Sequence, residues 1–158
     1  SGYGLPFAVT LFKPELDQWS PGEHNGTFRG NNHAFVTASA ALKEFWRDDK
    51  FAKSIQDKGK IIEERIQDII AAHPQAKLKS KGRGMMRGIE CESGDLAGEI
   101  TAKAFEHGLI IETSGPDGEV VKCLCPLTIS EDDLMTGWTV VERCFSEVFG
   151  KGEMKQAA

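Results

Sequence analysis

The sequence predicts an α/β fold, in which an early apolar stretch and a long helical segment precede a smaller unit of alternating strands and helices. Two patterns support this prediction. Apolar residues recur at helical spacing within residues 50–73 and 131–145, and two apolar runs flank the turn sequence Ser-Gly-Pro-Asp-Gly at 114–118. With 158 residues, 40% hydrophobic and 27% charged, the composition is that of one soluble globular domain.

The first apolar run covers residues 7–12, between Pro6 and Pro14. A near-continuous apolar run of this length is typical of an interior strand, which needs a neighbouring strand on each side. Because the chain begins at Ser1 without a methionine and enters this run almost at once, we expect it to be a fragment or one product of a cut chain. The alternative is a trimmed chain whose first strand lies at a sheet edge.

A polar, glycine-containing segment, EHNGTFRGNNHAF, follows at residues 23–35. Its side chains cannot fill a core, and its glycines let backbone amides turn toward a ligand, which is typical of an anion-binding turn. A helical pattern begins directly behind it, where the helix dipole favours negative charge. The alternative interpretation is an ordinary polar loop that caps the helix.

Two helices are expected next, over residues 33–45 and over a longer stretch that ends at Pro74. Residues 77–93 indicate a strand pair around glycines, or one strand with a bulge. A short helix ended by Gly108, a hairpin over 109–127 and a last helix capped by Ser130 complete the pattern, with Asp133 in the acidic position of a capping box.

Charge and cysteine usage exclude several classes of function. A net charge of -5 with scattered basic residues argues against a nucleic-acid partner, and no apolar run is long enough for a membrane span or a signal peptide. We therefore expect a cytoplasmic protein with no membrane partner. The spacing of Cys91, Cys123, Cys125 and Cys144 does not match a zinc site, so reduced thiols and no metal are expected. Cys123 and Cys125 fit core packing better than a redox or metal role.

Four segments in order resemble the C-terminal part of the class III aminotransferases, which are pyridoxal-phosphate enzymes of fold type I. They are residues 1–35, GRGMMRGIE, GLIIETSG and VVKCLCPLTISEDDL. Within that class the segments are most similar to the diaminobutyrate–2-oxoglutarate transaminases of ectoine biosynthesis. The resemblance implies three parts: the end of the large cofactor-binding domain at 1–34, connecting helices at 35–73, and a small C-terminal α/β domain at 74–158.

The resemblance also implies site residues around the cofactor pyridoxal 5'-phosphate. The threonine of the family's TF-x-GN motif, here Thr27, would bind the phosphate of the neighbouring subunit through its hydroxyl and the adjacent amides of Gly26 and Phe28. The enzyme is therefore expected to be a homodimer or a higher homo-oligomer. The family's Schiff-base lysine is expected just upstream of Ser1, so no catalytic residue is assigned here, and this chain alone is expected to be inactive.

Two residues depart from the family pattern. Arg29 stands where the family has a second glycine, and it would either bind a substrate carboxylate or solvate the loop. Lys122 stands where many members have the arginine that holds the substrate carboxylate, and the alternative is a solvated lysine at a strand end. Arg83 and Arg87 would be surface charges or carboxylate binders.

The predicted function is amino-group transfer between glutamate or 2-oxoglutarate and aspartate semialdehyde or 2,4-diaminobutyrate, so the expected partners are small amino and keto acids. Two alternatives stay open at this point. The first is another class III aminotransferase or an aminomutase. The second is a non-catalytic module of the same fold that binds an anion or a partner protein.

Overall fold

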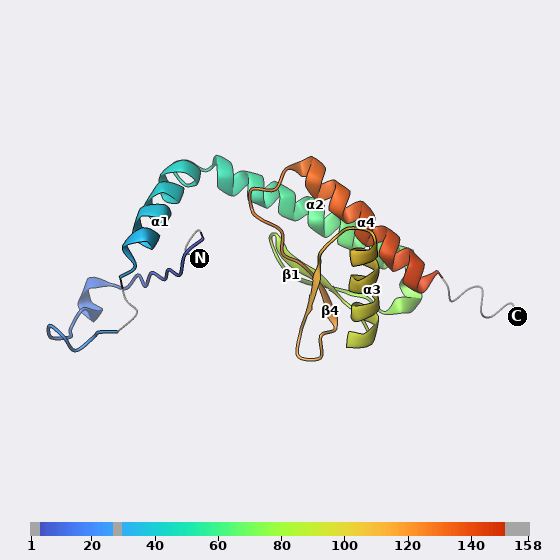
Figure 1. Ribbon diagram of the computed structural model, residues 1–158, viewed down its shortest axis with the longest axis horizontal. Coiled ribbons are helices and arrows are strands. Elements are labelled where there is room, and N and C mark those ends of the chain that lie inside the picture. Colours follow the sequence, from blue (N-terminus) through green and yellow to red (C-terminus); the bar gives the residue numbers. More distant parts are fainter. Residues whose placement is uncertain (1–3, 27–29, 151–158) are drawn as a thin grey trace, which may run out of the picture. The chain divides into compact units, whose positions relative to one another are not determined.

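The computed structural model describes residues 4–26 and 30–150 and divides the chain into two compact units, Ser1–Ala52 and Lys53–Ala158. Figure 1 shows the elements along the chain. Helix α2, Lys50–Ala72, begins in the first unit and continues into the second. Each unit is described by itself, and the predicted division of the chain at residues 34 and 73 stays a prediction.

The first unit contains no strand among its described residues, so the predicted strand over residues 7–12 is wrong. The segment runs as irregular chain into the short 3₁₀ helix η1, Pro14–Leu16. Leu11 is 92% exposed and Val9 is 63% exposed. A strand needs partners for its backbone N–H and C=O groups, and the described chain offers none here.

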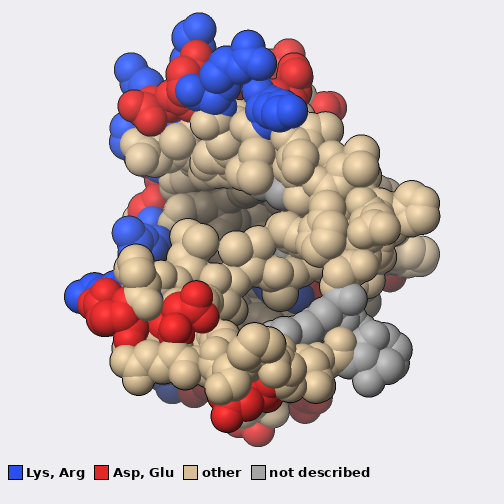
Figure 2. Space-filling model, turned by 90° about the vertical axis from the view of Figure 1, so that its left-hand side faces the viewer, with Lys and Arg blue, Asp and Glu red and all other residues tan. Residues whose placement is uncertain are grey.

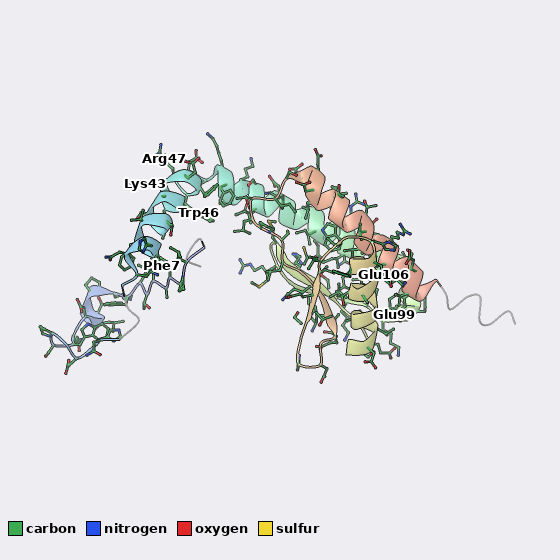
Figure 3. The ribbon with its side chains drawn as sticks, in the orientation of Figure 1. Phe7, Lys43, Trp46, Arg47, Glu99 and Glu106 are labelled. Atoms are coloured by element: carbon green, nitrogen blue, oxygen red, sulfur yellow. The ribbon has the colours of Figure 1, made fainter. Side chains whose placement is uncertain are left out.

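Helix α1, Asn32–Phe45, forms the rest of this unit and confirms the predicted first helix. Its small residues Ala34, Ala38 and Ala41 are buried, and the ring of Phe7 meets Phe35 edge-on with 5.8 Å between the ring centroids. Figure 3 shows Phe7 beside the helix, with Lys43, Trp46 and Arg47 at its other end.

The surface of the first unit is unusually apolar. Many of its large apolar side chains are more than 40% exposed: Val9, Leu11, Phe12, Leu16, Trp19, Phe35, Val36, Leu42 and Trp46. In the view of Figure 2, basic and acidic side chains mix along the upper edge, and uncharged residues form much of the remaining surface. Exposed apolar area of this extent is typical of a surface that another protein segment covers.

The second unit is built on a four-stranded antiparallel sheet with the order β1-β2-β4-β3. The strands are β1 at Lys79–Arg83, β2 at Met86–Glu90, β3 at Glu112–Ser114 and β4 at Val120–Cys123. The strand pair predicted around the glycines is β1 with β2, and the predicted hairpin is β3 with β4, so both predictions are confirmed.

Three helices cover one face of this sheet: α2, α3 at Gly94–Glu106 and α4 at Glu131–Phe149. The core joins Ile62 and Ile66 of α2 and Phe145 of α4 with Ile89 and Val121, which oppose each other across β2 and β4. Apolar side chains at three- and four-residue steps give α2 and α4 the buried stripe that the sequence predicted.

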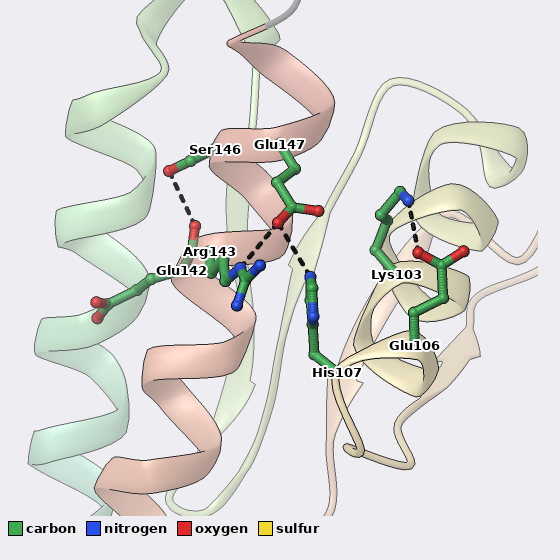
Figure 4. Close-up of polar contacts among 7 residues, drawn as sticks. All are labelled: Lys103, Glu106, His107, Glu142, Arg143, Ser146 and Glu147. Carbon is green, nitrogen blue, oxygen red and sulfur yellow. Dashed lines mark hydrogen bonds and ion pairs between the residues drawn. The ribbon is translucent and has the colours of Figure 1, made fainter.

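Polar contacts join the helices to the sheet and to one another. The Glu63 carboxylate on α2 accepts hydrogen bonds from Arg87 and from the Ser80 hydroxyl. Arg87 is thus neither a free surface charge nor a free carboxylate binder, whereas Arg83 is exposed. Figure 4 shows Glu147 of α4 bound by Arg143 and by His107, which follows α3.

The ends of the helices follow the predicted capping chemistry. The Ser130 hydroxyl accepts a hydrogen bond from the Asp133 N–H at 3.0 Å and donates one to the Asp133 carboxylate at 2.7 Å. Gly108 follows α3 with φ +82°, a left-handed conformation that glycine adopts without strain. Within the described residues, none of the helices is long and apolar enough to cross a membrane.

Candidate functional site

The segment predicted to bind an anion leads directly into α1. Gly26 is exposed, whereas Thr27, Phe28 and Arg29 lie outside the described residues. Gly30 adopts φ +81°, and the Asn31 side chain caps the helix by accepting the N–H of Ala34 at 3.1 Å. The threonine motif therefore immediately precedes the amino-terminal end of a 14-residue helix, where the macrodipole favours an anion.

Lys122 lies on the face of the sheet opposite the helices, because its neighbour Val121 points into the core. In the antiparallel register it stands opposite Glu112, and its Nζ lies 3.3 Å from the Glu112 Oε2. The Lys122 side chain is 25% exposed and that of Glu112 is 76% exposed. The ammonium is thus half-buried and already holds a carboxylate, which a substrate carboxylate could replace.

The same face of the sheet carries a second cluster of charges. Glu90 accepts hydrogen bonds from Lys79 at 2.8 Å and forms an ion pair with Lys81 at 2.6 Å. Hydrogen bonds from Lys79 and Lys81 lower the pKa of the Glu90 carboxyl. The Lys79 and Lys81 side chains are 68% and 53% exposed against 25% for Lys122, so solvent screens their charges more and they are less suited to hold a substrate carboxylate.

A cavity of about 390 Å³ opens between the end of β4 and α4. Its walls are mainly apolar, and they include Leu109, Ile111, Cys123, Cys125, Trp138 and Val141. Lys122 and Glu112 also line it. Cys123 and Cys125 therefore share this cavity, whereas the Lys122 side chain turns toward the opposite face of the sheet.

One buried cation holds the chain that follows β4. Lys58 of α2 is 7% exposed, and its Nζ donates hydrogen bonds to the carbonyl oxygens of Leu127 and Ile129, each at 2.8 Å. Neutral carbonyls can satisfy a buried ammonium only when several converge on it. Lys58 consequently fixes residues 124–130, the segment that joins β4 to α4.

The four cysteines are free thiols with different surroundings. Burial raises the pKa of Cys91 to about 11. A hydrogen bond from Cys123 lowers the pKa of Cys125 to about 7, although burial opposes this, and the Lys58 charge acts in the lowering direction. The same hydrogen bond raises the pKa of Cys123. Of the two thiols, Cys125 is therefore the one that loses its proton more readily.

Two of the predicted site residues, Gly26 and Lys122, lie within the described residues, in different units of the chain. Gly26 belongs to the first unit and Lys122 to the second. Sequence reasoning missed Glu112 and Lys58. Strand alternation could have found Glu112 once the hairpin register was known, and helical spacing could have found Lys58, which lies four residues before Ile62 on the buried stripe of α2. No group of three or more His, Cys, Asp or Glu side chains in residues 4–26 and 30–150 is arranged to hold a metal ion.

A family model described as aminotransferase class III matches residues 1–145. The chain belongs to this family. The match includes the threonine motif, the sheet and most of α4, and class III aminotransferases use pyridoxal phosphate. The predicted resemblance and the predicted fold class, a C-terminal part of fold type I, are thereby confirmed.

Several similar curated proteins are named diaminobutyrate–2-oxoglutarate transaminase. The protein from Halomonas elongata is 55% identical over 151 residues, which cover 94% of this chain and 36% of that protein. The protein from Vibrio parahaemolyticus is 54% identical over 157 residues, which cover 99% of this chain and 37% of that protein. The chain thus spans about a third of the length of the relatives it matches.

Solved structures of aminotransferases share the fold. The acetylornithine aminotransferase from Elizabethkingia anophelis matches with a TM-score of 0.70 and 26% identity, over 84% of this chain and 34% of that one. The lysine aminotransferase from M. tuberculosis matches with a TM-score of 0.72 and 23% identity, over 81% of this chain and 29% of that one. The coverage again corresponds to about a third of each enzyme.

Proposed function

We propose that this chain is part of a pyridoxal-phosphate-dependent transaminase that moves an amino group between glutamate and aspartate semialdehyde, giving 2-oxoglutarate and 2,4-diaminobutyrate. The observation that supports this most is the 55% identity to a diaminobutyrate–2-oxoglutarate transaminase over 94% of the chain. The identities to acetylornithine and lysine aminotransferases, 26% and 23%, are far lower. Another class III activity, an aminomutase and a non-catalytic module are therefore disfavoured.

The segment before α1 fits a phosphate group. A dianion needs fixed donors, and a threonine hydroxyl together with glycine-flanked amides at a helix start provides them without a buried counter-charge. Residues Gly26, Thr27 and Phe28 would hold the phosphate of pyridoxal phosphate. When bound, that group supplies the electron sink for amino transfer. Arg29 would bind a substrate carboxylate.

Lys122 would hold a carboxylate shared by the amino donor and the keto acid. Its ammonium contacts Glu112, whose carboxylate is 76% exposed and can swing into solvent. A substrate carboxylate that replaces Glu112 keeps the lysine neutralised, so the half-buried charge is never left without a partner. Lysine holds a carboxylate as a point charge, without the two-point grip of arginine.

Direct assay of the full-length enzyme tests the proposed reaction. We expect glutamate and aspartate semialdehyde to give 2,4-diaminobutyrate, with kcat/KM at least about tenfold above that for acetylornithine or lysine as donor, because a pocket selects by differential binding in the transition state. Equal or faster turnover of acetylornithine or lysine would favour another class III activity. If the correctly folded, cofactor-loaded protein turned over none of these substrates, a non-catalytic binding module would be favoured.

Thr27→Ala in the full-length enzyme should weaken cofactor binding roughly ten- to a hundredfold, since one hydrogen bond to a charged group contributes about 1.5–3 kcal/mol. Absorbance titration with pyridoxal phosphate measures this affinity. The thermal midpoint of the apoenzyme should hardly change, because Thr27 lies in a polar segment, and saturating cofactor should restore most of the turnover. An unchanged cofactor affinity would leave the segment as a helix-capping loop.

Lys122→Met should raise the KM for glutamate and for 2-oxoglutarate by about ten- to a hundredfold, because a charge-assisted hydrogen bond to the carboxylate is lost. The affinity for pyridoxal phosphate should stay within about twofold of wild type, which makes this variant the counterpart of Thr27→Ala. Lys79→Met is the matched control on the same sheet face, and it should leave both KM values unchanged. Equal effects of the two lysine variants would remove the carboxylate role from Lys122.

Oligomerisation is part of this proposal. The exposed apolar residues of the first unit, such as Val9, Leu11 and Val36, need cover, and the resemblance places Thr27 against the cofactor of a neighbouring subunit. We expect a homodimer or a larger homo-oligomer acting on small acids in the cytoplasm. Light scattering of the active full-length enzyme would contradict this if it gave the mass of a monomer.

A further inference from the structure

Two thiols lie on one face of the chain beside the proposed carboxylate-binding lysine. Cys123 is the last residue of β4, and Cys125 follows two positions later, so both side chains turn toward the helices while Lys122 turns away. Both cysteines are half-buried, and both line the 390 Å³ cavity. This differs from Cys91 and Cys144, which are buried within the core.

The surroundings of the two thiols favour one thiolate. The neighbouring Cys123 thiol lowers the pKa of Cys125, and the Lys58 ammonium acts in the same direction. Lys58 itself is bound to two carbonyls, so its charge is not neutralised by a carboxylate in these contacts. A cavity wall with a stabilised thiolate is the setting of a reactive cysteine, whereas a thiol in an apolar core is inert.

We propose that Cys125 is a site of reversible modification by low-molecular-weight disulfides such as oxidised glutathione, with Cys123 as the thiol that resolves the mixed disulfide. The cavity beside the two sulfurs leaves room for the substituent of a small thiol. The sequence alone favours core packing of both cysteines over such a redox role.

The exchange conserves atoms and electrons. The Cys125 thiolate attacks one sulfur of oxidised glutathione, forms a Cys125–glutathione disulfide and releases one glutathione thiolate. The Cys123 thiol then loses its proton and attacks the Cys125 sulfur, which forms the Cys123–Cys125 disulfide and releases the second glutathione thiolate. Two protein thiols are oxidised, and the small disulfide is reduced to two thiols.

The second step closes a short ring. Two residues of extended chain span about 6.6 Å, which is near the upper limit of the Cα separation in a disulfide. The chain must bend to close the ring, and a strained disulfide is easily reduced. The modification is consequently reversible, and the bend would displace Lys122 next to it.

Peptide mapping of the full-length holoenzyme after treatment with oxidised glutathione tests the chemistry without an activity assay. Wild type should lose two hydrogens from the peptide that contains Cys123 and Cys125, and dithiothreitol should restore them. Cys123→Ser should stop at a mixed disulfide on Cys125. Cys125→Ser should give neither product on this peptide, and Cys91→Ser should behave as wild type.

Reactivity provides a second readout that does not depend on ring closure. Iodoacetamide at pH 7.5 should label Cys125 at least about tenfold faster than Cys91, because the thiolate is the nucleophile. Labelling of Cys125 no faster than that of Cys91, or a wild-type peptide unchanged by oxidised glutathione, would overturn the proposal and leave both thiols as core packing.

The consequence for catalysis rests on the proposed function of Lys122. Oxidised wild-type enzyme should show a KM for glutamate raised at least about threefold, while Cys125→Ser should keep its own KM after the same treatment. If the peptide is oxidised and KM does not change, the modification site stands and the displacement of Lys122 by the disulfide fails, while Lys122→Met tests the carboxylate role by itself. The two results are thus distinguishable.

Discussion

Phe145→Ala should lower the free energy of unfolding of the 158-residue chain by about 3–5 kcal/mol, the usual cost of truncating a fully buried aromatic side chain. The Phe145 side chain is 0% exposed and lies in the cluster that joins α4 to the sheet and to α2. Truncation removes the transfer free energy of the ring and leaves a cavity that the surrounding helices can only partly fill. Urea unfolding followed by circular dichroism measures the loss.

Phe105→Ala is the matched control for Phe145→Ala. Phe105 lies on α3 in the same unit, but its side chain is 70% exposed. The same chemical change should therefore cost less than about 1 kcal/mol. Comparable losses for the two variants would contradict the core assigned to α4 and the sheet, because burial would then not determine the cost.

The sequence predicted the elements of the second unit well because their patterns are local. Ser130 with Asp133 marks the start of α4, and Gly108 marks the end of α3. The turn at 114–118 forces a return of the chain, so the hairpin follows from turn chemistry alone. In these elements local propensity and tertiary packing agree, which is why a single sequence is enough to predict them.

The first unit was predicted less well for an equally physical reason. An apolar run at residues 7–12 has strand-like composition, but a strand exists only when other chain satisfies its backbone groups. The described residues offer no such partner, and the run stays irregular, with Leu11 92% exposed. Composition thus indicates that this segment is suited to burial, without identifying the neighbour that would bury it.

The residues of the candidate site also differ in whether the sequence alone can predict them. Lys122 could be singled out because it replaces an arginine of the family pattern, and Thr27 because it belongs to a motif. Glu112 acquires its importance only from the register that places it opposite Lys122. Lys58 lies 69 positions before Leu127, so only the folded chain brings them together. Residues that are so far apart in the sequence meet only in the folded chain. A sequence pattern within one helix or strand therefore cannot predict their contact.

Lys58→Met should lower the free energy of unfolding by about 2–4 kcal/mol, because two part-buried carbonyl oxygens lose their donor and each such loss costs about 1–3 kcal/mol. Methionine keeps most of the side-chain volume, so packing changes little. Methionine also avoids the desolvation penalty of a buried ammonium, which favours the folded variant. This gain keeps the expected loss of stability below the sum of the upper estimates for the two carbonyls. Urea unfolding of the 158-residue chain measures the balance.

Lys60→Met is the matched control for Lys58→Met, because it removes an exposed lysine from the same helix. Lys60 is exposed, and it forms an ion pair with Asp57 at 2.8 Å, an interaction that usually contributes less than about 1 kcal/mol. Limited proteolysis should cut Lys58→Met faster within residues 124–130, because those residues lose the two hydrogen bonds that fix them, whereas Lys60→Met should be cut at the wild-type rate.

A Lys58→Met chain that is as stable as wild type would mean that desolvation of the ammonium cancels its two hydrogen bonds. Unchanged proteolysis in addition would show that other contacts hold the segment between β4 and α4.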